Sequence, residues 1–274
     1  MYPFLIEKVR RIIRNLIVCD SVVYSLLSYV VTGAIIIYKE NLKIWCLLKK
    51  CASGAAGPHP IKIKLKNLAS PIAIRAVKSD VVTVINNIIR EEYGRIAPAC
   101  KIPKYMVDAG AYIGDTAAFF LTRYKELKVI SLEPNDDNFR MAKTNLNPYG
   151  KRVILLQKAL WGTDKQMGFV GNQTVGQVSE TGDGVECISI PTLMHRYCMP
   201  WLDILKMDIE GAERDVFESN AERWLSLVEL IIIEIHGNQN LRVISRILQK
   251  NSFEMVQYRS VWYCRRISRA KPPG

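Results

Sequence analysis

Five short apolar runs recur between residues 105 and 235, and amphipathic stretches lie between most of them. Such alternation of strands with helices predicts a parallel sheet that has helices on both faces. Ligands of these sheets bind beyond the carboxyl ends of the strands. The predicted strands are residues 106–108, 129–132, 153–156, 202–207 and 230–235.

Two further apolar runs, residues 253–258 and 261–264, are separated by only a few residues. A connection this short can join only antiparallel strands. We therefore expect an α/β fold with a Rossmann-like, mostly parallel seven-stranded sheet that ends in a C-terminal antiparallel hairpin.

The segment before this sheet has its own pattern. Residues 61–65 alternate strictly between apolar and polar, which predicts a strand, and residues 72–75 are its expected hairpin partner. Ser79 and Asp80 then form a predicted cap for a helix over residues 81–93. A cluster rich in glycine and proline at residues 53–60 separates these elements from the N-terminus.

We therefore divide the chain into three parts. Residues 1–60 form a basic and apolar helical extension, residues 61–100 form the hairpin and helix, and residues 101–274 form the main domain. Residues 21–38 carry no charge and just reach the length that spans a bilayer. Two interpretations stay open: helices that pack on the domain or lie in a membrane interface, and a true span.

The charge is distributed unevenly. Of the net +12, nine excess positive charges fall before residue 101. Such a bias suits nucleic acid, an anionic membrane or an acidic glycan, but no reader motif gives a specific nucleic-acid signal. The seven cysteines have no metal-ligand spacing, which favours reduced, buried thiols in a cytoplasmic protein. Membrane association stays open, and the oligomeric state is not predicted.

The junction between the first strand and its helix reads Asp-Ala-Gly-Ala-Tyr-Ile-Gly-Asp-Thr, starting at Asp108. Gly110 allows a sharp turn and leaves room for a ligand, and Gly114 permits close packing. A dinucleotide fingerprint would need another glycine at the position of Tyr112. A ligand without phosphate, such as S-adenosylmethionine, does not need that glycine. Its amino group and sulfonium are cationic and suit an acidic residue such as Asp108 or Asp115. Taken alone, the loop fits a structural tight turn equally well.

Acidic residues stand at the ends of other strands. Glu133 follows the second strand about 20 residues after the glycine loop, where a carboxylate can accept hydrogen bonds from both ribose hydroxyls. Asp208 and Glu210 follow the fourth strand, and Glu234 and His236 end the fifth. Burial of such groups is costly unless they are paired or bind a ligand. A satisfied structural network is the alternative interpretation.

Together these segments resemble the FkbM-type methyltransferases. The matching motifs are the glycine loop, Leu-Glu-Pro-Asn at residues 132–135, Leu-Lys-Met-Asp-Ile-Glu-Gly-Ala-Glu at residues 205–213, and Ile-Glu-Ile-His at residues 233–236. The resemblance extends over residues 70–240, and the 205–213 stretch is its most specific mark. Tyr112 departs from the family pattern, which often has asparagine there.

The resemblance implies a class I methyltransferase fold and S-adenosylmethionine as the cofactor. Family members mostly methylate hydroxyl groups on sugars, glycans and related small molecules, which implies a small-molecule or glycan acceptor. The residues expected to bind the cofactor come from the glycine loop and from the ends of the second and fourth strands: Asp108, Gly110, Ala111, Tyr112, Gly114, Asp115, Thr116, Glu133, Pro134, Asn135 and Asp208.

A hydroxyl is a poor nucleophile while it is protonated, so a nearby base should raise the rate. Asp208 and His236 are the candidate bases, with Glu210 or Glu234 orienting them or holding a cation. Metal assistance is a secondary hypothesis, because no ligand spacing identifies a metal site. His195 is expected either near the substrate entrance or in an ordinary loop.

Two other functions stay open. One is N-methylation of protein or nucleic acid, which the basic N-terminal third could serve. The other is a methyltransferase-like domain that binds a partner without catalysis. Residues 168–184, rich in Gly, Ser, Thr and Gln, are expected to form a mobile flap over the site.

Overall fold

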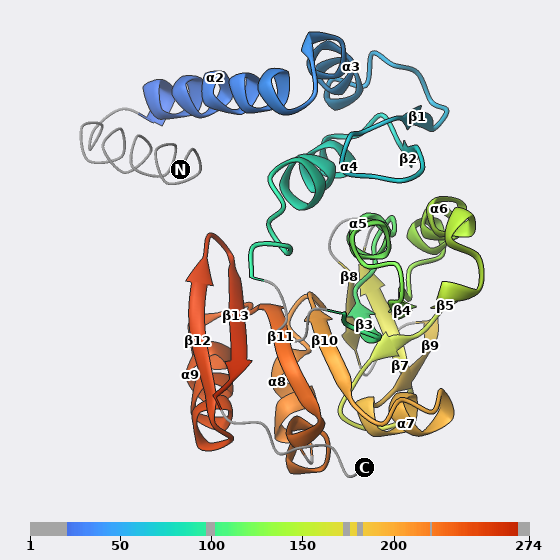
Figure 1. Cartoon of the computed structure of the whole chain (residues 1–274), viewed down its shortest axis with the longest axis vertical. Helices are drawn as coiled ribbons and strands as arrows, with labels where there is room; N and C mark the ends of the chain where they lie inside the picture. The colour runs from blue at the N-terminus through green and yellow to red at the C-terminus, as the bar shows by residue number, and fades with distance from the viewer. Residues whose placement is uncertain (1–20, 97–101, 172–175, 180–182, 220, 268–274) are drawn as a thin grey trace.

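A computed structural model describes residues 21–96, 102–171, 176–179, 183–219 and 221–267. Its central element is a seven-stranded sheet with the order β12-β13-β11-β10-β3-β4-β5 (Figure 1). Neighbouring strands from β11 to β5 are parallel, and only β13 runs against the others. The strands are β3 (Tyr105–Ala109), β4 (Lys128–Leu132), β5 (Val153–Leu156), β10 (Leu202–Met207), β11 (Val228–Glu234), β12 (Phe253–Tyr258) and β13 (Val261–Arg266).

All seven predicted strands are therefore confirmed, with ends shifted by no more than a few residues. The last pair is antiparallel, as its short connection requires. The chain has the mostly parallel, Rossmann-like sheet of class I methyltransferases, together with N-terminal helices and a small hairpin.

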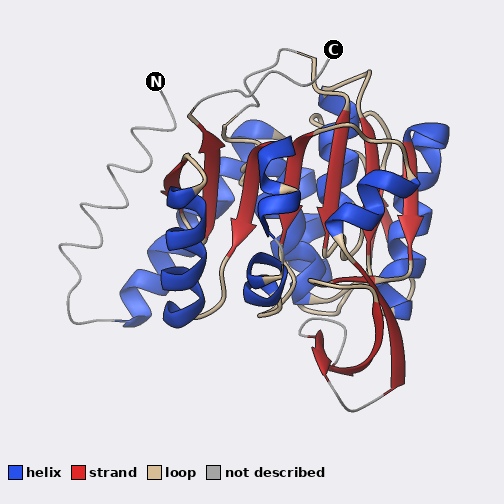
Figure 2. Cartoon of the chain, turned by 90° about the horizontal axis from the view of Figure 1, so that it is seen from below, coloured by secondary structure: helices blue, strands red, loops and turns tan. Residues whose placement is uncertain are grey.

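Helices cover both faces of this sheet (Figure 2). Along β11, Leu230 and Ile232 belong to one hydrophobic cluster, whereas Ile231 and Ile233 belong to the other, because successive side chains of a strand point to opposite faces. One cluster includes α5 (Asp115–Arg123) and α6 (Asp136–Leu146), and the other includes α7 (Ile190–Arg196), α8 (Glu213–Glu218) and α9 (Asn238–Lys250). The short helices η2 (Asn147–Arg152), η3 (Ala221–Arg223) and η4 (Leu225–Leu227) complete the connections.

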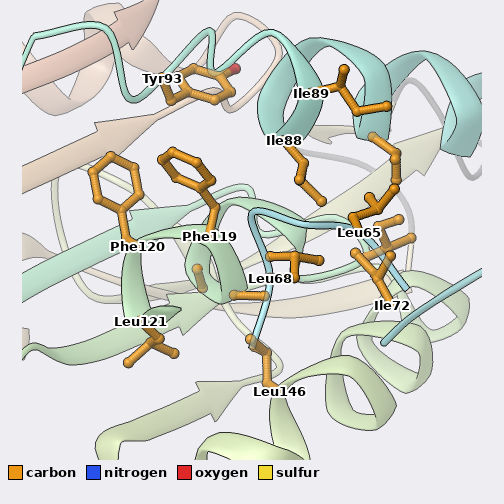
Figure 3. Packing of buried hydrophobic residues seen from close by; sticks show 14 of the residues in the cluster. Leu65, Leu68, Ile72, Ile88, Ile89, Tyr93, Phe119, Phe120, Leu121 and Leu146 are labelled. Carbon is orange, nitrogen blue, oxygen red and sulfur yellow. The ribbon is translucent and has the colours of Figure 1, made fainter. Parts of the chain in front are cut away.

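The N-terminal elements share the core of the first face. Strands β1 and β2 form the expected antiparallel hairpin, and Leu65, Leu68 and Ile88 pack beside Phe119 and neighbouring side chains (Figure 3). Buried residues of α2 and α3 join the same cluster. The proposed boundaries at residues 60 and 100 stay a prediction. The elements are α2 (Ser21–Lys39), α3 (Leu42–Ala52), β1 (Ile61–Ile63), β2 (Ile72–Ile74), α4 (Lys78–Thr83) and the π-helix η1 (Val84–Ile89).

The predicted helix cap at Ser79 and Asp80 is wrong. Helix α4 begins earlier, its cap position is Val77, and no side chain caps it. The Asp80 carboxylate instead accepts hydrogen bonds from the backbone and guanidinium of Arg75, so tertiary contacts override its preference for a cap. The helical stretch also ends at Ile89, short of the predicted Tyr93.

The described residues of the predicted flap, residues 168–184, are strands, and none of them lines the cavity described below. The mobility of this segment stays a prediction. A four-stranded sheet of order β6-β9-β7-β8 follows β5 and projects from the main sheet (Figure 2). Residues 172–175 and 180–182 lie outside the described part. The strands are β6 (Ala159–Leu160), β7 (Lys165–Gly171), β8 (Gly176–Ser179) and β9 (Asp183–Ile188).

Two sequence expectations concern the environment of the chain. Among the described residues, no helix has both the length and the apolar character required to cross a bilayer. The cysteines are only partly as expected: Cys51, Cys187 and Cys264 are buried free thiols, but Cys46 and Cys198 are exposed. Cys19 and Cys100 lie outside the described residues.

Candidate active site

A cavity of about 500 Å³ opens beyond the carboxyl ends of β3, β4 and β10. This is the edge at which open parallel sheets bind their ligands, and the volume falls in the range of small-molecule sites. Helix α4 and η1 supply a further wall. Nine of the predicted residues line the cavity: Gly110, Tyr112, Asp115, Thr116, Glu133, Pro134, Asn135, Asp208 and Glu210.

The glycine loop is fixed by close backbone contact with β10. Gly110 has a φ of +76°, and a Cβ atom there would lie 1.8 Å from the carbonyl oxygen of Asp208. Gly114 also has a positive φ, and a Cβ there would lie 2.9 Å from the Leu146 side chain. Gly114 thus permits the close packing that the sequence predicts, and Gly110 also serves packing between two strand ends.

Glu133 lies at the end of β4 and anchors the loop to the cavity wall. Its carboxylate accepts hydrogen bonds from the backbone N–H groups of Tyr112 (2.7 Å) and Asn135 (2.9 Å). Burial raises the pKa of Glu133 to about 7, although these two donors stabilise the charged form. The side chain of Asn138 is a further hydrogen-bond partner, and because a carboxylate has about four lone-pair sites, Glu133 keeps acceptor capacity for a ligand.

Asn87 lines the cavity, and our sequence reasoning missed it. Its side-chain amide donates to Asp115 (2.8 Å) and lies 3.4 Å from the hydroxyl of Thr116. Burial raises the pKa of Asp115 to about 6, against the opposing effect of this amide. A signal was present, because Asn86 and Asn87 interrupt an apolar helical run, and the resulting turn is a π-helix, which often marks functional sites.

Lys206 was also missed. It is 2% exposed, and its ammonium group lies 3.4 Å from Asp108 and donates to the carbonyl oxygens of Ala109 and Gly110. Burial opposes its charge, but the nearby carboxylates, led by Asp108, outweigh burial and raise the pKa of Lys206. Asp108 is itself fully buried and does not line the cavity. It holds Lys206 beneath the glycine loop. The sequence feature that could have identified Lys206 is a lysine within an otherwise apolar, buried strand.

Next to the cavity, Asp208, Glu210 and His236 converge. One ligand atom from each can be chosen so that all three lie within 4.8 Å of one another. The Tyr93 hydroxyl donates to Asp208 at 3.0 Å, and His236 Nε2 lies 3.6 Å from Glu210. The structure thus brings together the three residues proposed as catalytic.

Glu213 orients His236 from the other side. Its carboxylate is fully buried and lies 2.8 Å from His236 Nδ1. This hydrogen bond, opposed by burial and helped by the other nearby carboxylates, raises the pKa of His236 to about 9. His236 is therefore charged at neutral pH in the free protein, and an imidazolium has no lone pair with which to accept a proton.

The remaining predicted residues lie outside the cavity lining. Ala111 and Gly114 belong to the loop behind it, and Glu234 ends β11, half-buried, with a pKa raised by burial and then by Asp208. His195 is exposed in the last turn of α7, so it is neither in a loop nor at the cavity. No pattern in the sequence indicates where α7 lies relative to the site.

Residues 108–255 match the family model of the methyltransferase FkbM domain, which is more than half of the chain. The chain belongs to the FkbM methyltransferase family. The match begins at Asp108 in the glycine loop and includes Glu133, Asp208 and His236. The resemblance that the sequence motifs suggested is thus confirmed.

Other comparisons are more distant. A ribosomal RNA small subunit methyltransferase H from Nocardia farcinica is 33% identical over 73 residues, or 27% of this chain, and the chain covers 22% of that protein's length. A precorrin-6y C5,15-methyltransferase from Geobacter metallireducens is 12% identical (TM-score 0.39, covering 61% of this chain and 80% of that one). A methyltransferase from Geobacter sulfurreducens is 16% identical (TM-score 0.38, covering 81% and 88%). The fold assignment of this FkbM-family chain rests on its own strand order.

The cavity of this FkbM-family chain fits S-adenosylmethionine in its donor set. Glu133 has free lone pairs for hydroxyl donors, and the carboxylates of Asp115 and Asp208 suit the cationic amino-acid end. The described cavity lining holds no arginine and three lysines, Lys78, Lys158 and Lys206, of which Lys158 pairs with Glu186 and Lys206 with Asp108. The four lining carboxylates, Asp115, Glu133, Asp208 and Glu210, suit a cationic nucleoside.

Proposed function

We propose that this chain is an S-adenosylmethionine-dependent methyltransferase that methylates a hydroxyl group on a sugar, glycan or related small molecule. The observation that carries the proposal is the carboxylate-lined cavity at the strand ends, with Asp208, Glu210 and His236 at its border. Membership of the FkbM family supports methyl transfer. The hydroxyl acceptor follows from what that family mostly methylates.

The bound cofactor would supply an electrophilic methyl group on a sulfonium. Glu133 would accept the ribose hydroxyls, and Asp115 would face the amino-acid end. Holding two reactants aligned supplies much of the rate in such a displacement. Asp208, oriented by the Tyr93 hydroxyl, would take the acceptor proton. His236 in its charged state would position the acceptor rather than act as the base.

The test is transfer of a labelled methyl group from the cofactor to a panel of glycans, small alcohols, protein and RNA. We expect label on glycans or small alcohols, and a loss of at least about 100-fold in the Asp208→Asn variant with its fold intact, which is the scale of one acid–base group. The control is Glu126→Gln, an exposed residue before β4 at the opposite edge of the sheet. Wild-type turnover in Asp208→Asn would remove Asp208 from the mechanism.

N-methylation of nucleic acid is the second candidate, favoured by the basic N-terminal third and by the partial match to a ribosomal RNA methyltransferase. Label on RNA alone would select it. A non-catalytic chain that binds partners would bind no cofactor.

We also propose that α2 and α3 contact an anionic membrane surface. Val30, Ile37 and Leu42 are exposed there, and Lys43 and Lys50 are exposed beside them. Exposed apolar side chains flanked by lysines suit the interface of an anionic bilayer.

A further inference from the structure

We infer that Asp208, Glu210 and His236 form a divalent cation site at the border of the cavity. The inference rests on the proposed function, because it concerns how the same site would receive its acceptor. The ligand atoms of these residues can lie within 4.8 Å of one another, as they must to share one ion. No spacing in the sequence identified this set, since the ligands come from the ends of two strands.

The surroundings of His236 support this site independently. Metal-binding histidines usually donate their second ring nitrogen to a carboxylate, which fixes the ring and directs the other nitrogen at the ion. Glu213 takes that place: it lies outside the three-ligand set, is 0% exposed, and contacts His236 Nδ1 at 2.8 Å. His236 Nε2 then faces Glu210, and a bound cation would displace the proton that Nε2 carries in the free protein.

The local charge balance points the same way. Among the described residues, the carboxylates of Asp208, Glu210 and Glu213 surround one imidazole, while Lys206 is engaged by Asp108 and by backbone carbonyls. Three carboxylates therefore exceed the charge of one imidazole even when His236 is protonated. The second carboxylate oxygen of Glu213, Oε2, has no hydrogen-bond partner among the described residues. A concentration of partly buried carboxylates is costly without a compensating cation. This cluster stands out in a chain of net charge +12.

The donor set indicates the class of ion. Two carboxylates suit Mg²⁺ and Mn²⁺, and one imidazole shifts the preference toward Mn²⁺ or a later transition metal. Because three protein ligands leave coordination positions open, an acceptor hydroxyl can bind the ion directly. A bound cation would lower the pKa of the acceptor hydroxyl, whose proton would pass to the carboxylate oxygen of Asp208 that does not hold the ion.

The test is titration of the metal-stripped full chain with Mn²⁺. Binding is measured as the decrease in the electron paramagnetic resonance signal of the free ion. We expect one Mn²⁺ per chain, at least about tenfold weaker binding in Asp208→Asn and His236→Ala, and no change in Glu126→Gln. Competition of Mg²⁺ and Zn²⁺ with bound Mn²⁺ ranks the affinities of the three ions for the site. Circular dichroism confirms that each variant is folded.

Glu213 is a positioning residue and needs a separate readout. Glu213→Gln should weaken Mn²⁺ binding by about tenfold while its calorimetric affinity for S-adenosylmethionine stays that of the wild type. A general loss of structure would weaken the binding of Mn²⁺ and of S-adenosylmethionine together. His236→Ala, at a partly exposed residue, keeps the test informative if Glu213→Gln does not fold.

The outcomes separate the two proposals. A wild-type chain that binds the cofactor but no Mn²⁺, or Mn²⁺ affinities that are equal in wild type, Asp208→Asn and His236→Ala, would overturn the cation site and leave the proposed function standing. Mn²⁺ binding that depends on these residues, in a chain that transfers no methyl group to any acceptor, would support the site and contradict the proposed function.

Discussion

At the scale of single residues, the position of each charged group relative to a buried strand decides what it can do. Glu133 and Asp208 each follow a buried strand directly, so their carboxylates reach the cavity, whereas Asp108 lies inside its strand and is fully buried. The strand pattern predicted the first two places. It did not predict that Asp108 pairs with Lys206, because sequence alone does not show which strand lies next to β3.

Gly110 is the residue whose replacement has the clearest structural cost. In Gly110→Ala, the new methyl group would meet the Asp208 carbonyl in a left-handed backbone conformation. We expect a loss of unfolding free energy on the order of 3 kcal/mol or more, from strain and overpacking together. Urea denaturation measures it.

The matched control is Gly57→Ala. Gly57 also has a positive φ, but a Cβ there meets nothing within 4 Å. In Gly57→Ala, backbone strain alone should lower the unfolding free energy by about 1–2 kcal/mol. Equal losses in the two variants would show that the close contact at Gly110 is not formed.

His236 predicts a dependence of stability on pH. Its folded pKa of about 9 lies above the unfolded value of 6.5, because the carboxylates of Glu213, Asp208 and Glu210 outweigh the opposing effect of burial. Between these pH values the folded state holds more protons, so the unfolding free energy falls as the pH rises from 6.5 through 9. Urea denaturation in chelator at pH 6.5 and 9.5 measures the fall, which should be smaller in His236→Ala. An equal fall in the wild type and in His236→Ala would contradict a raised pKa of His236 as its cause.

At the scale of elements, strands that are buried on both faces were predictable and surface strands were not. The apolar runs of β10 and β11 leave little choice of structure, because no other element buries so short a segment completely. The β7–β9 strands have no such signal, since their glycines and polar residues resemble a loop. The start of helix α4 was misplaced because the Asp80 side chain accepts hydrogen bonds from Arg75 and Tyr112 instead of capping the helix.

The N-terminal helices give a prediction at this scale. If α2 and α3 contact an anionic surface, the full chain should co-sediment with phosphatidylserine-containing vesicles and much less with phosphatidylcholine vesicles. Lys43→Glu with Lys50→Glu should reduce binding by about tenfold or more, at about 1 kcal/mol for each lysine removed. Lys125→Glu with Lys151→Glu, at exposed sites outside α2 and α3, is the control. Equal sedimentation of both double variants would exclude this surface.

At the scale of the whole molecule, the fold converts separate motifs into one site. The parallel order β11-β10-β3-β4 places four strand ends side by side, so residues more than 100 positions apart meet. The Tyr93–Asp208 contact shows that the elements before the main sheet contribute to the site. The sequence of the segment that ends in Glu92 and Tyr93 resembles the family, but it did not show which residue Tyr93 contacts. The sequence therefore allowed the sheet and most of the cavity lining to be predicted, but not the wall that α4 and η1 supply.

The central claim is that this cavity binds S-adenosylmethionine, and calorimetric titration of the full chain tests it most directly. The account predicts one cofactor per chain, affinity weakened at least about tenfold in Glu133→Gln through loss of charge-assisted hydrogen bonds, and wild-type affinity in Glu126→Gln. A folded wild-type chain that binds no cofactor, or a Glu133→Gln variant that binds it as tightly as the wild type, would contradict the account.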